Sequence, residues 1–178
     1  SICTNFYLEE IIKDQKYKVF DSAFFLATFQ ESRIKETIAL KRTLDSLKFH
    51  TQFILYCNKN EQSKTLKENN IVIIKKPITY YESLKMTLQS RVLIDIHNPI
   101  HDGLSFRIFE AIGYEKKLIT TNKEVAKYDF YDTRNILIWE NQCAKEIEAF
   151  CKAPYSKIDP QIKEKYALKS WIKRYSNH

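Results

Sequence analysis

Glycine is almost absent from this sequence, whose 178 residues include only Gly103 and Gly113. This scarcity excludes collagen-like and glycine-rich low-complexity architectures. Long apolar runs are missing too, since none approaches the roughly 20 residues that a membrane-spanning helix needs. The stretch SICTNFYLEEIIKDQ lacks both a basic start and a long apolar core. We therefore expect no secretory signal.

Cysteine is sparse and unpatterned. The four cysteines show no C-x-x-C spacing: Cys3, Cys57, Cys143 and Cys151. We expect them to be reduced thiols in a cytoplasmic protein. His97 and His101 form a candidate metal-ligand pair, but Pro99 between them prevents a helical i,i+4 arrangement. Because a D-x-D element is also missing, we expect neither a metal nor another cofactor.

Acidic residues are outnumbered: 29 lysines and arginines stand against 22 aspartates and glutamates, giving a formal net charge of +7. This excess fits three anionic partners, namely nucleic acid, a membrane surface and a phosphorylated small molecule, or simply a solvated surface. Lysine greatly outnumbers arginine, whereas recognition of base edges favours arginine forks. We therefore expect no nucleic-acid partner.

Apolar runs alternate with helical patterns along the chain. The predicted strands are residues 23–29, 51–57, 71–76, 91–97, 117–121 and 135–140, and the predicted helices are 31–49, about 61–69, 79–89, the stretch between the two glycines, 143–152 and 159–175. The strands are apolar without clean alternation, which is typical of a parallel sheet covered on both faces. We predict an α/β fold: a doubly wound, Rossmann-like parallel sheet of about six strands, with helices on both faces and a C-terminal helix packed back.

The chain divides into an extension, residues 1–16, and one Rossmann-like domain, residues 17–178. The extension is either an extra helix, carrying Phe6 and Leu8 on its apolar face, or the remnant of a connection from a preceding domain. The tail, 159–175, begins at a helix cap, Asp159. It either docks back on the domain or presents a basic, aromatic face to anionic lipid.

Both glycines lie in the segment HDGLSFRIFEAIGYEKKLITTN, which follows the fourth predicted strand. In doubly wound sheets, ligands bind beyond the carboxyl ends of the strands. Gly103 leaves the backbone bare just before a helix, and Ser105 and the first N–H groups of the helix suit a phosphate. Alternatively, Gly103 only makes a turn and Ser105 only caps the helix.

Glu110 lies in the middle of this helix, which is apolar around most of its circumference. A buried carboxylate needs a partner. Arg107, three residues earlier on the same face, supplies one by an i,i+3 ion pair. Alternatively, Glu110 accepts hydrogen bonds from a ligand's sugar hydroxyls while Arg107 faces phosphate. The sequence leaves both alternatives open.

Asp102 and Glu110 stand in a D-x7-E spacing, and the segment DGLSFRIFEAIGYEKKLITTN resembles the donor site of GT-B glycosyltransferases, E-G-(x)6-E-A followed by a later glycine. It is more narrowly similar to bacterial proteins of lipopolysaccharide and capsule biosynthesis. This sequence has aspartate where the pattern has its first glutamate, and it has Glu115 and Lys116 where the later glycine belongs.

The resemblance implies a role for each matching position. Glu110 matches the glutamate that binds the donor ribose, and Asp102 matches the acidic residue beside the transferred sugar, which makes it the candidate catalytic residue. The backbone of Gly103, Leu104 and Ser105 matches the diphosphate cradle. Arg107 recurs in the narrower group, and we expect it to face phosphate.

Two further residues precede this segment. Arg33 follows the first predicted strand, where it either contributes charge to the donor diphosphate or is simply solvated. His97 ends the fourth predicted strand, where a hydrogen bond to the donor sugar is one interpretation.

These observations lead to one hypothesis for function. The chain is the donor-binding half of a glycosyltransferase that moves a sugar from a nucleotide-diphosphate donor to a cell-surface glycan or lipid-linked acceptor. It needs a second, acceptor-binding domain, so we expect the chain alone to be inactive. We expect it in the cytoplasm, with peripheral contact to the inner membrane face. The alternative is a non-catalytic, Rossmann-like module that binds a nucleotide or a protein partner.

Overall fold

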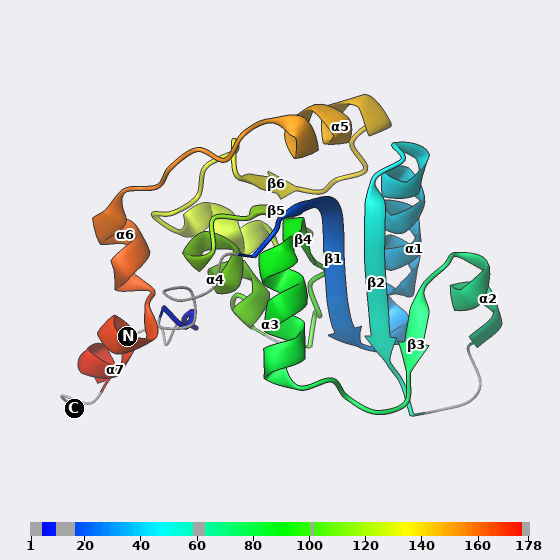
Figure 1. Ribbon diagram of the computed structural model, residues 1–178, viewed down its shortest axis with the longest axis horizontal. Helices are drawn as coiled ribbons and strands as arrows, with labels where there is room; N and C mark the ends of the chain where they lie inside the picture. The colour runs from blue at the N-terminus through cyan, green and yellow to red at the C-terminus, as the bar shows by residue number, and fades with distance from the viewer. Residues whose placement is uncertain (1–4, 10–16, 59–62, 101, 176–178) are drawn as a thin grey trace.

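The computed structural model describes residues 5–9, 17–58, 63–100 and 102–175 (Figure 1). The strands are β1 Phe20–Thr28, β2 His50–Tyr56, β3 Val72–Ile74, β4 Ser90–Asp95, β5 Lys117–Thr120 and β6 Ile136–Ile138. The helices are α1 Glu31–Ser46, α2 Ser63–Glu68, α3 Tyr80–Gln89, α4 Phe106–Gly113, the 3₁₀ helix η2 Lys123–Lys127, α5 Ala144–Lys152, α6 Pro160–Lys165 and α7 Leu168–Tyr175.

The six strands form one sheet in the order β3-β2-β1-β4-β5-β6, and all pairs are parallel. The chain builds outwards from β1 to β3, then returns to the middle and builds outwards again from β4 to β6. The strand order therefore reverses between β1 and β4, which is where ligands bind in doubly wound sheets. The predicted Rossmann-like α/β fold is confirmed.

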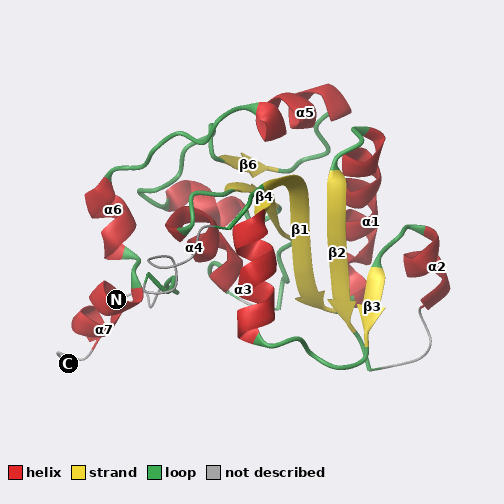
Figure 2. Cartoon of the chain, viewed as in Figure 1, coloured by secondary structure: helices red, strands yellow, loops and turns green. Residues whose placement is uncertain are grey.

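Helices cover both faces of the sheet (Figure 2). One hydrophobic core joins α1, α2 and α5 to one face, and a second joins α3 and α4 to the other. Successive residues of a strand point to opposite cores: in β4, Val92 and Ile94 belong to the first and Leu93 to the second. Burial on both sides explains why the strands lack an alternation of apolar and polar residues.

Most of the helices and strands predicted from the sequence are present, with differences at their ends. β1 begins at Phe20 rather than at residue 23, and β3 is confined to Val72–Ile74. The tail forms two helices and not one, because the helical conformation is interrupted between α6 and α7. At this break Tyr7 forms an isolated parallel bridge with Ala167, accepting from the Leu168 N–H and donating to the Tyr166 carbonyl.

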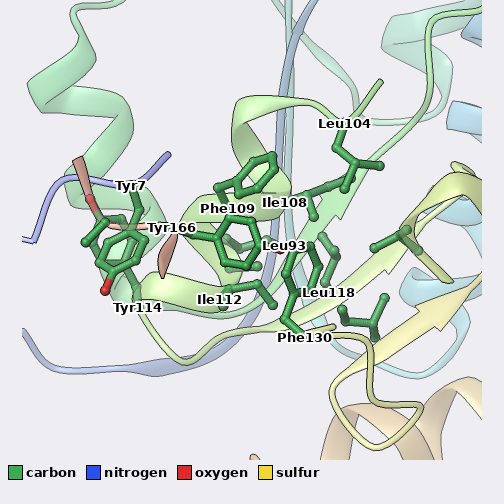
Figure 3. Close-up of a cluster of buried hydrophobic side chains, with 14 of the residues drawn as sticks. Tyr7, Leu93, Leu104, Ile108, Phe109, Ile112, Tyr114, Leu118, Phe130 and Tyr166 are labelled. Atoms are coloured by element: carbon green, nitrogen blue, oxygen red, sulfur yellow. The ribbon is translucent and has the colours of Figure 1, made fainter. Parts of the chain in front are cut away.

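The described part of the N-terminal extension, residues 5–9, is not helical. It lies across the C-terminal helices, with the Phe6 ring against Trp171 of α7 and Phe106 of α4. Tyr7 belongs to the second core, near Phe109, Tyr114 and Tyr166 (Figure 3). Residues 5–9 and the two terminal helices therefore pack against each other and against the domain.

Among the described residues, no helix combines the length and apolarity needed to cross a bilayer.

Candidate functional site

The larger pocket of the site opens where the strand order reverses. Its volume is about 620 Å³. It is lined by one residue of the extension, by the ends of β1 and β4 and the residues that follow them, and by the loop before α4: Asn5, Ala27, Thr28, Gln30, Arg33, Asp95, Ile96, His97, Asn98, Asp102, Gly103, Leu104 and Ser105. The fold thus brings Arg33 into one cavity with His97 and the segment 102–105, although Arg33 lies far from them in the sequence.

Arg33 supplies positive charge at this point. One guanidinium nitrogen donates to the Thr28 carbonyl at the end of β1 (2.6 Å), and another donates to the Ile96 carbonyl just beyond β4 (3.2 Å). Burial lowers the pKa of Arg33, while the nearby Asp95 carboxylate opposes that effect. The hydrogen-bond partners of Arg33 are uncharged carbonyls, so its guanidinium brings a positive charge to the edge of the pocket, with the Asp95 carboxylate nearby.

Asp95, the last residue of β4, is a site residue that the sequence analysis missed. It is only 7% exposed. Its carboxylate accepts from the Ser105 hydroxyl (2.6 Å) and from the Thr120 hydroxyl of β5 (2.7 Å). The available signal was an acidic residue ending an otherwise apolar strand, since a carboxylate there must find donors or a ligand.

Ser105 occupies the N-cap position of α4, but its side chain does not cap the helix. The hydroxyl donates to Asp95 instead, so the alternative in which Ser105 only caps the helix is wrong. The hydroxyl donates a charge-assisted hydrogen bond to the buried carboxylate, and in this orientation its oxygen accepts none from the helix N–H groups. Any contact of Ser105 with a ligand therefore uses its backbone, as the resemblance implies.

Gly103 has φ +83, a conformation that glycine adopts readily and other residues rarely do. A side chain there would meet no atom within 4 Å, so the space in front of this backbone is open. The Gly103 carbonyl accepts from the Asn122 amide, which holds the loop in place (2.9 Å). Gly103 is thus required by the turn, and it also leaves room beside the pocket.

A smaller pocket of about 260 Å³ lies between α3, α4 and the ends of β1 and β4. Arg33, Asp95 and Ser105 line both pockets, so the two are adjacent. Glu110 and Tyr80 line only the smaller one.

Glu110 is 2% exposed and forms an ion pair with Arg107 (2.6 Å). The Arg107 guanidinium also donates to the Thr87 and Ser83 hydroxyls of α3 and lies over the Phe24 ring. The i,i+3 pair anticipated from the sequence is therefore present. Because the guanidinium is already engaged by α3 and by Glu110, its contact with phosphate stays a prediction.

Burial is the main influence on the pKa of Glu110 and on the pKa of Tyr80. Burial raises the pKa of the Glu110 carboxyl, although Arg107 and the hydrogen-bonded Tyr80 hydroxyl pull it back. Burial likewise raises the pKa of Tyr80 to about 12. Tyr80 therefore remains a phenol at neutral pH and can donate to Glu110 or to a ligand in the smaller pocket.

His97 lies just beyond β4 and lines the larger pocket. Its backbone N–H donates to the Thr121 hydroxyl (2.8 Å), and its Nδ1 lies 3.2 Å from the Asn122 amide nitrogen. Asp102, the candidate catalytic residue, is exposed at the same pocket. His101, the other half of the candidate metal pair, lies outside the described residues.

Two further site residues were not anticipated, Asn122 and Asn5. Asn122 closes the quoted segment, and an asparagine directly after a buried strand was its available signal. Asn5 donates to the Leu104 carbonyl (2.9 Å) and lines the larger pocket, but it belongs to the extension, whose conformation the sequence left open.

The chain matches no protein-family model and no curated protein. Solved structures do resemble it. AviGT4, a glycosyltransferase of avilamycin A biosynthesis, has a TM-score of 0.59 at 9% identity, over 91% of this chain and 51% of its own. The C-terminal domain of LpcC, a group 1 glycosyltransferase from Francisella tularensis, has a TM-score of 0.50 at 13% identity, over 96% and 93%.

A third structure is the pneumococcal O-GlcNAc transferase GtfA in complex with UDP and GlcNAc, with a TM-score of 0.52 at 14% identity, over 98% of this chain and 37% of GtfA. The chain thus spans about half of AviGT4, but nearly all of the isolated LpcC domain. These likenesses define the class of fold: the chain has the architecture of the C-terminal half of a GT-B glycosyltransferase.

Proposed function

We propose that this chain is the donor-binding domain of a glycosyltransferase, which transfers a sugar from a nucleotide-diphosphate donor to a cell-surface glycan or a lipid-linked acceptor. The observation that carries the proposal is Arg33, bound to the carbonyls of Thr28 and Ile96 at the reversal of strand order, beside the start of α4. A cation and free helix N–H groups together suit a diphosphate.

The two adjacent pockets match the parts of such a donor. In our proposal the nucleoside occupies the smaller pocket, where Tyr80 and Glu110 meet the base and the ribose. The diphosphate lies between Arg33 and the backbone of residues 103–105. The sugar extends into the larger pocket, beside His97 and Asp102. As the nucleoside diphosphate departs from the sugar, Arg33 and the N-terminal N–H groups of α4 stabilise the negative charge on its phosphates.

Binding of a nucleoside diphosphate tests the proposal directly. We expect UDP or GDP to raise the melting temperature of the chain, and Arg33→Gln to weaken binding at least about tenfold. Arg91→Gln is the matched control, because Arg91 pairs with Asp21 at the other end of β4. If neither nucleotide binds, or if both arginine variants bind as tightly as the wild type, the donor site is not here and a partner-binding module becomes the better hypothesis.

Catalysis needs more than this chain. The chain spans only part of the AviGT4 and GtfA chains. In our proposal a second domain binds the acceptor and closes the cleft over Asp102. Measurable sugar transfer by the chain alone would contradict the proposal that catalysis needs a second domain.

A membrane-borne acceptor would favour peripheral attachment. Helix α7 leaves Ile172 49% exposed, and Lys169 and Lys173 lie on the same short helix. We propose that this face contacts anionic lipid from the cytoplasmic side. Co-sedimentation with vesicles containing phosphatidylglycerol should weaken in Ile172→Asp, and unchanged sedimentation would contradict the contact.

A further inference from the structure

The side-chain orientation of Asn122 is fixed by two neighbours with opposite demands. Its amide nitrogen donates to the Gly103 carbonyl (2.9 Å), and its carbonyl oxygen accepts from the Glu124 N–H (3.0 Å). A flipped amide would place its oxygen against the Gly103 carbonyl, two acceptors, and its nitrogen against the Glu124 N–H, two donors. Asn122 is 3% exposed, so water cannot relieve such a mismatch.

This orientation determines the tautomer of His97. The Asn122 atom that faces the ring is the amide nitrogen, a donor, and it lies 3.2 Å from Nδ1. Nδ1 must therefore accept, and the ring proton must lie on Nε2. Within the described part of the chain, no partner engages Nε2, and His97 lines the larger pocket.

We infer that Asn122 is a positioning residue that holds His97 as the neutral Nε2–H tautomer, so that His97 donates a hydrogen bond to an oxygen of the bound ligand. The donor role rests on the proposed function, whereas the tautomer itself does not. In this state Nε2 has no lone pair with which to remove a proton. His97 therefore recognises the donor and does not act as a general base.

The tautomer is measurable without any ligand. In protein with ¹⁵N-labelled histidine and in mildly alkaline buffer, we expect the His97 Nε2 resonance to be of the protonated, pyrrole type and Nδ1 of the pyridine type. His97→Gln assigns the resonances among the four histidines. A protonated Nδ1 in the wild type would overturn the inference, and this measurement needs no variant to fold except for assignment.

Asn122→Asp tests whether Asn122 sets the tautomer of His97. The aspartate keeps an oxygen for the Glu124 N–H but presents an acceptor to His97, so the proton should move to Nδ1. Asn135→Asp is the matched control, since Asn135 is equally buried but is bonded to the Ser156 backbone. If Asn122→Asp leaves the His97 resonances unchanged, Asn122 does not set the tautomer.

The donor role is tested with UDP and UDP-glucose. A glutamine amide reproduces the Nε2–H donor, so His97→Gln should bind within about threefold of the wild type, whereas His97→Ala should lose about tenfold. A loss with UDP itself assigns the acceptor to the diphosphate, and a loss with UDP-glucose alone assigns it to the sugar. Equal binding by both variants contradicts the donor role, while failure of the wild type to bind either probe contradicts the proposed function and leaves the tautomer standing.

Discussion

Helix α4 has different surroundings at its two ends. Before its first turn, Gly103 faces open space, and the Ser105 hydroxyl is turned away to Asp95. At its last residue, a side chain on Gly113 would lie 2.2 Å from the Tyr7 ring, so this end is packed without a gap. The two glycines of the chain thus serve opposite purposes: one keeps a backbone accessible, and the other lets an aromatic ring approach.

The difference shows how one short helix can support both a core and the candidate binding site. The first turn keeps its N–H groups available for a ligand, which is possible because the second half of the helix is held by burial. The Arg107–Glu110 pair lies between the two ends: it is largely buried, and it also lines the smaller pocket. It can position the helix, contact a ligand, or do both, and substitutions along α4 separate these roles.

The largest effect is expected at the ion pair. Arg107→Met leaves the Glu110 carboxylate buried without its cation, which should cost about 3–5 kcal/mol of unfolding free energy in urea titrations at neutral pH. Because burial already raises the pKa of Glu110 in the folded state, acidification should let it take up a proton and reduce the loss.

A double substitution provides the control for this prediction. Arg107→Met combined with Glu110→Gln removes the stranded charge and should recover much of the stability. If Arg107→Met is nearly neutral by itself, the pair does not hold the helix, and Arg107 is then available for phosphate.

Lys116 follows the buried end of α4, and its ionisation reports whether water is excluded there. Burial lowers the pKa of Lys116 to about 8, and its ammonium donates to the Leu88 carbonyl. The unfolded chain holds this proton up to about pH 10, so the folding stability contributed by this group should rise between about pH 8 and pH 10, by about 2 kcal/mol.

Lys116→Met isolates this contribution. The difference in unfolding free energy between the wild type and the variant should grow with pH over that window. The comparison stops at about pH 10, because tyrosines whose pKa is raised in the folded state, such as Tyr80, begin to act in the opposite direction. A difference that does not depend on pH would show that water reaches Lys116.

Gly113→Ala should cost about 1.5 kcal/mol, because the displacement of Tyr7 outweighs the better helix propensity of alanine. In a Tyr7→Ala background the same change should be neutral or stabilising, since the clash is gone. Equal losses in both backgrounds would mean that the two residues are not coupled.

Much of this arrangement follows from local sequence. The apolar runs predicted six parallel strands, and the spacing of Arg107 and Glu110 predicted their pair. The roles of Asp95, Asn122 and Tyr7 did not follow, because each depends on a partner brought close by the fold rather than by spacing along an element. Ser105 shows the limit most clearly: local rules predict a helix cap, but its hydroxyl donates to a carboxylate ten residues earlier and caps nothing.

The open end of α4 gives the smallest change in stability and the clearest effect on binding. Gly103→Ala should cost about 1 kcal/mol, because φ +83 strains alanine although no atom lies within 4 Å. Gly103→Asn should lose less stability, since asparagine tolerates positive φ better. If a ligand approaches this backbone, both variants should nevertheless bind UDP about tenfold more weakly by isothermal titration, because both place a side chain in its path. Wild-type affinity in Gly103→Asn would instead assign Gly103 to the turn alone, so that one glycine would serve a positive φ and the other the close approach of the Tyr7 ring.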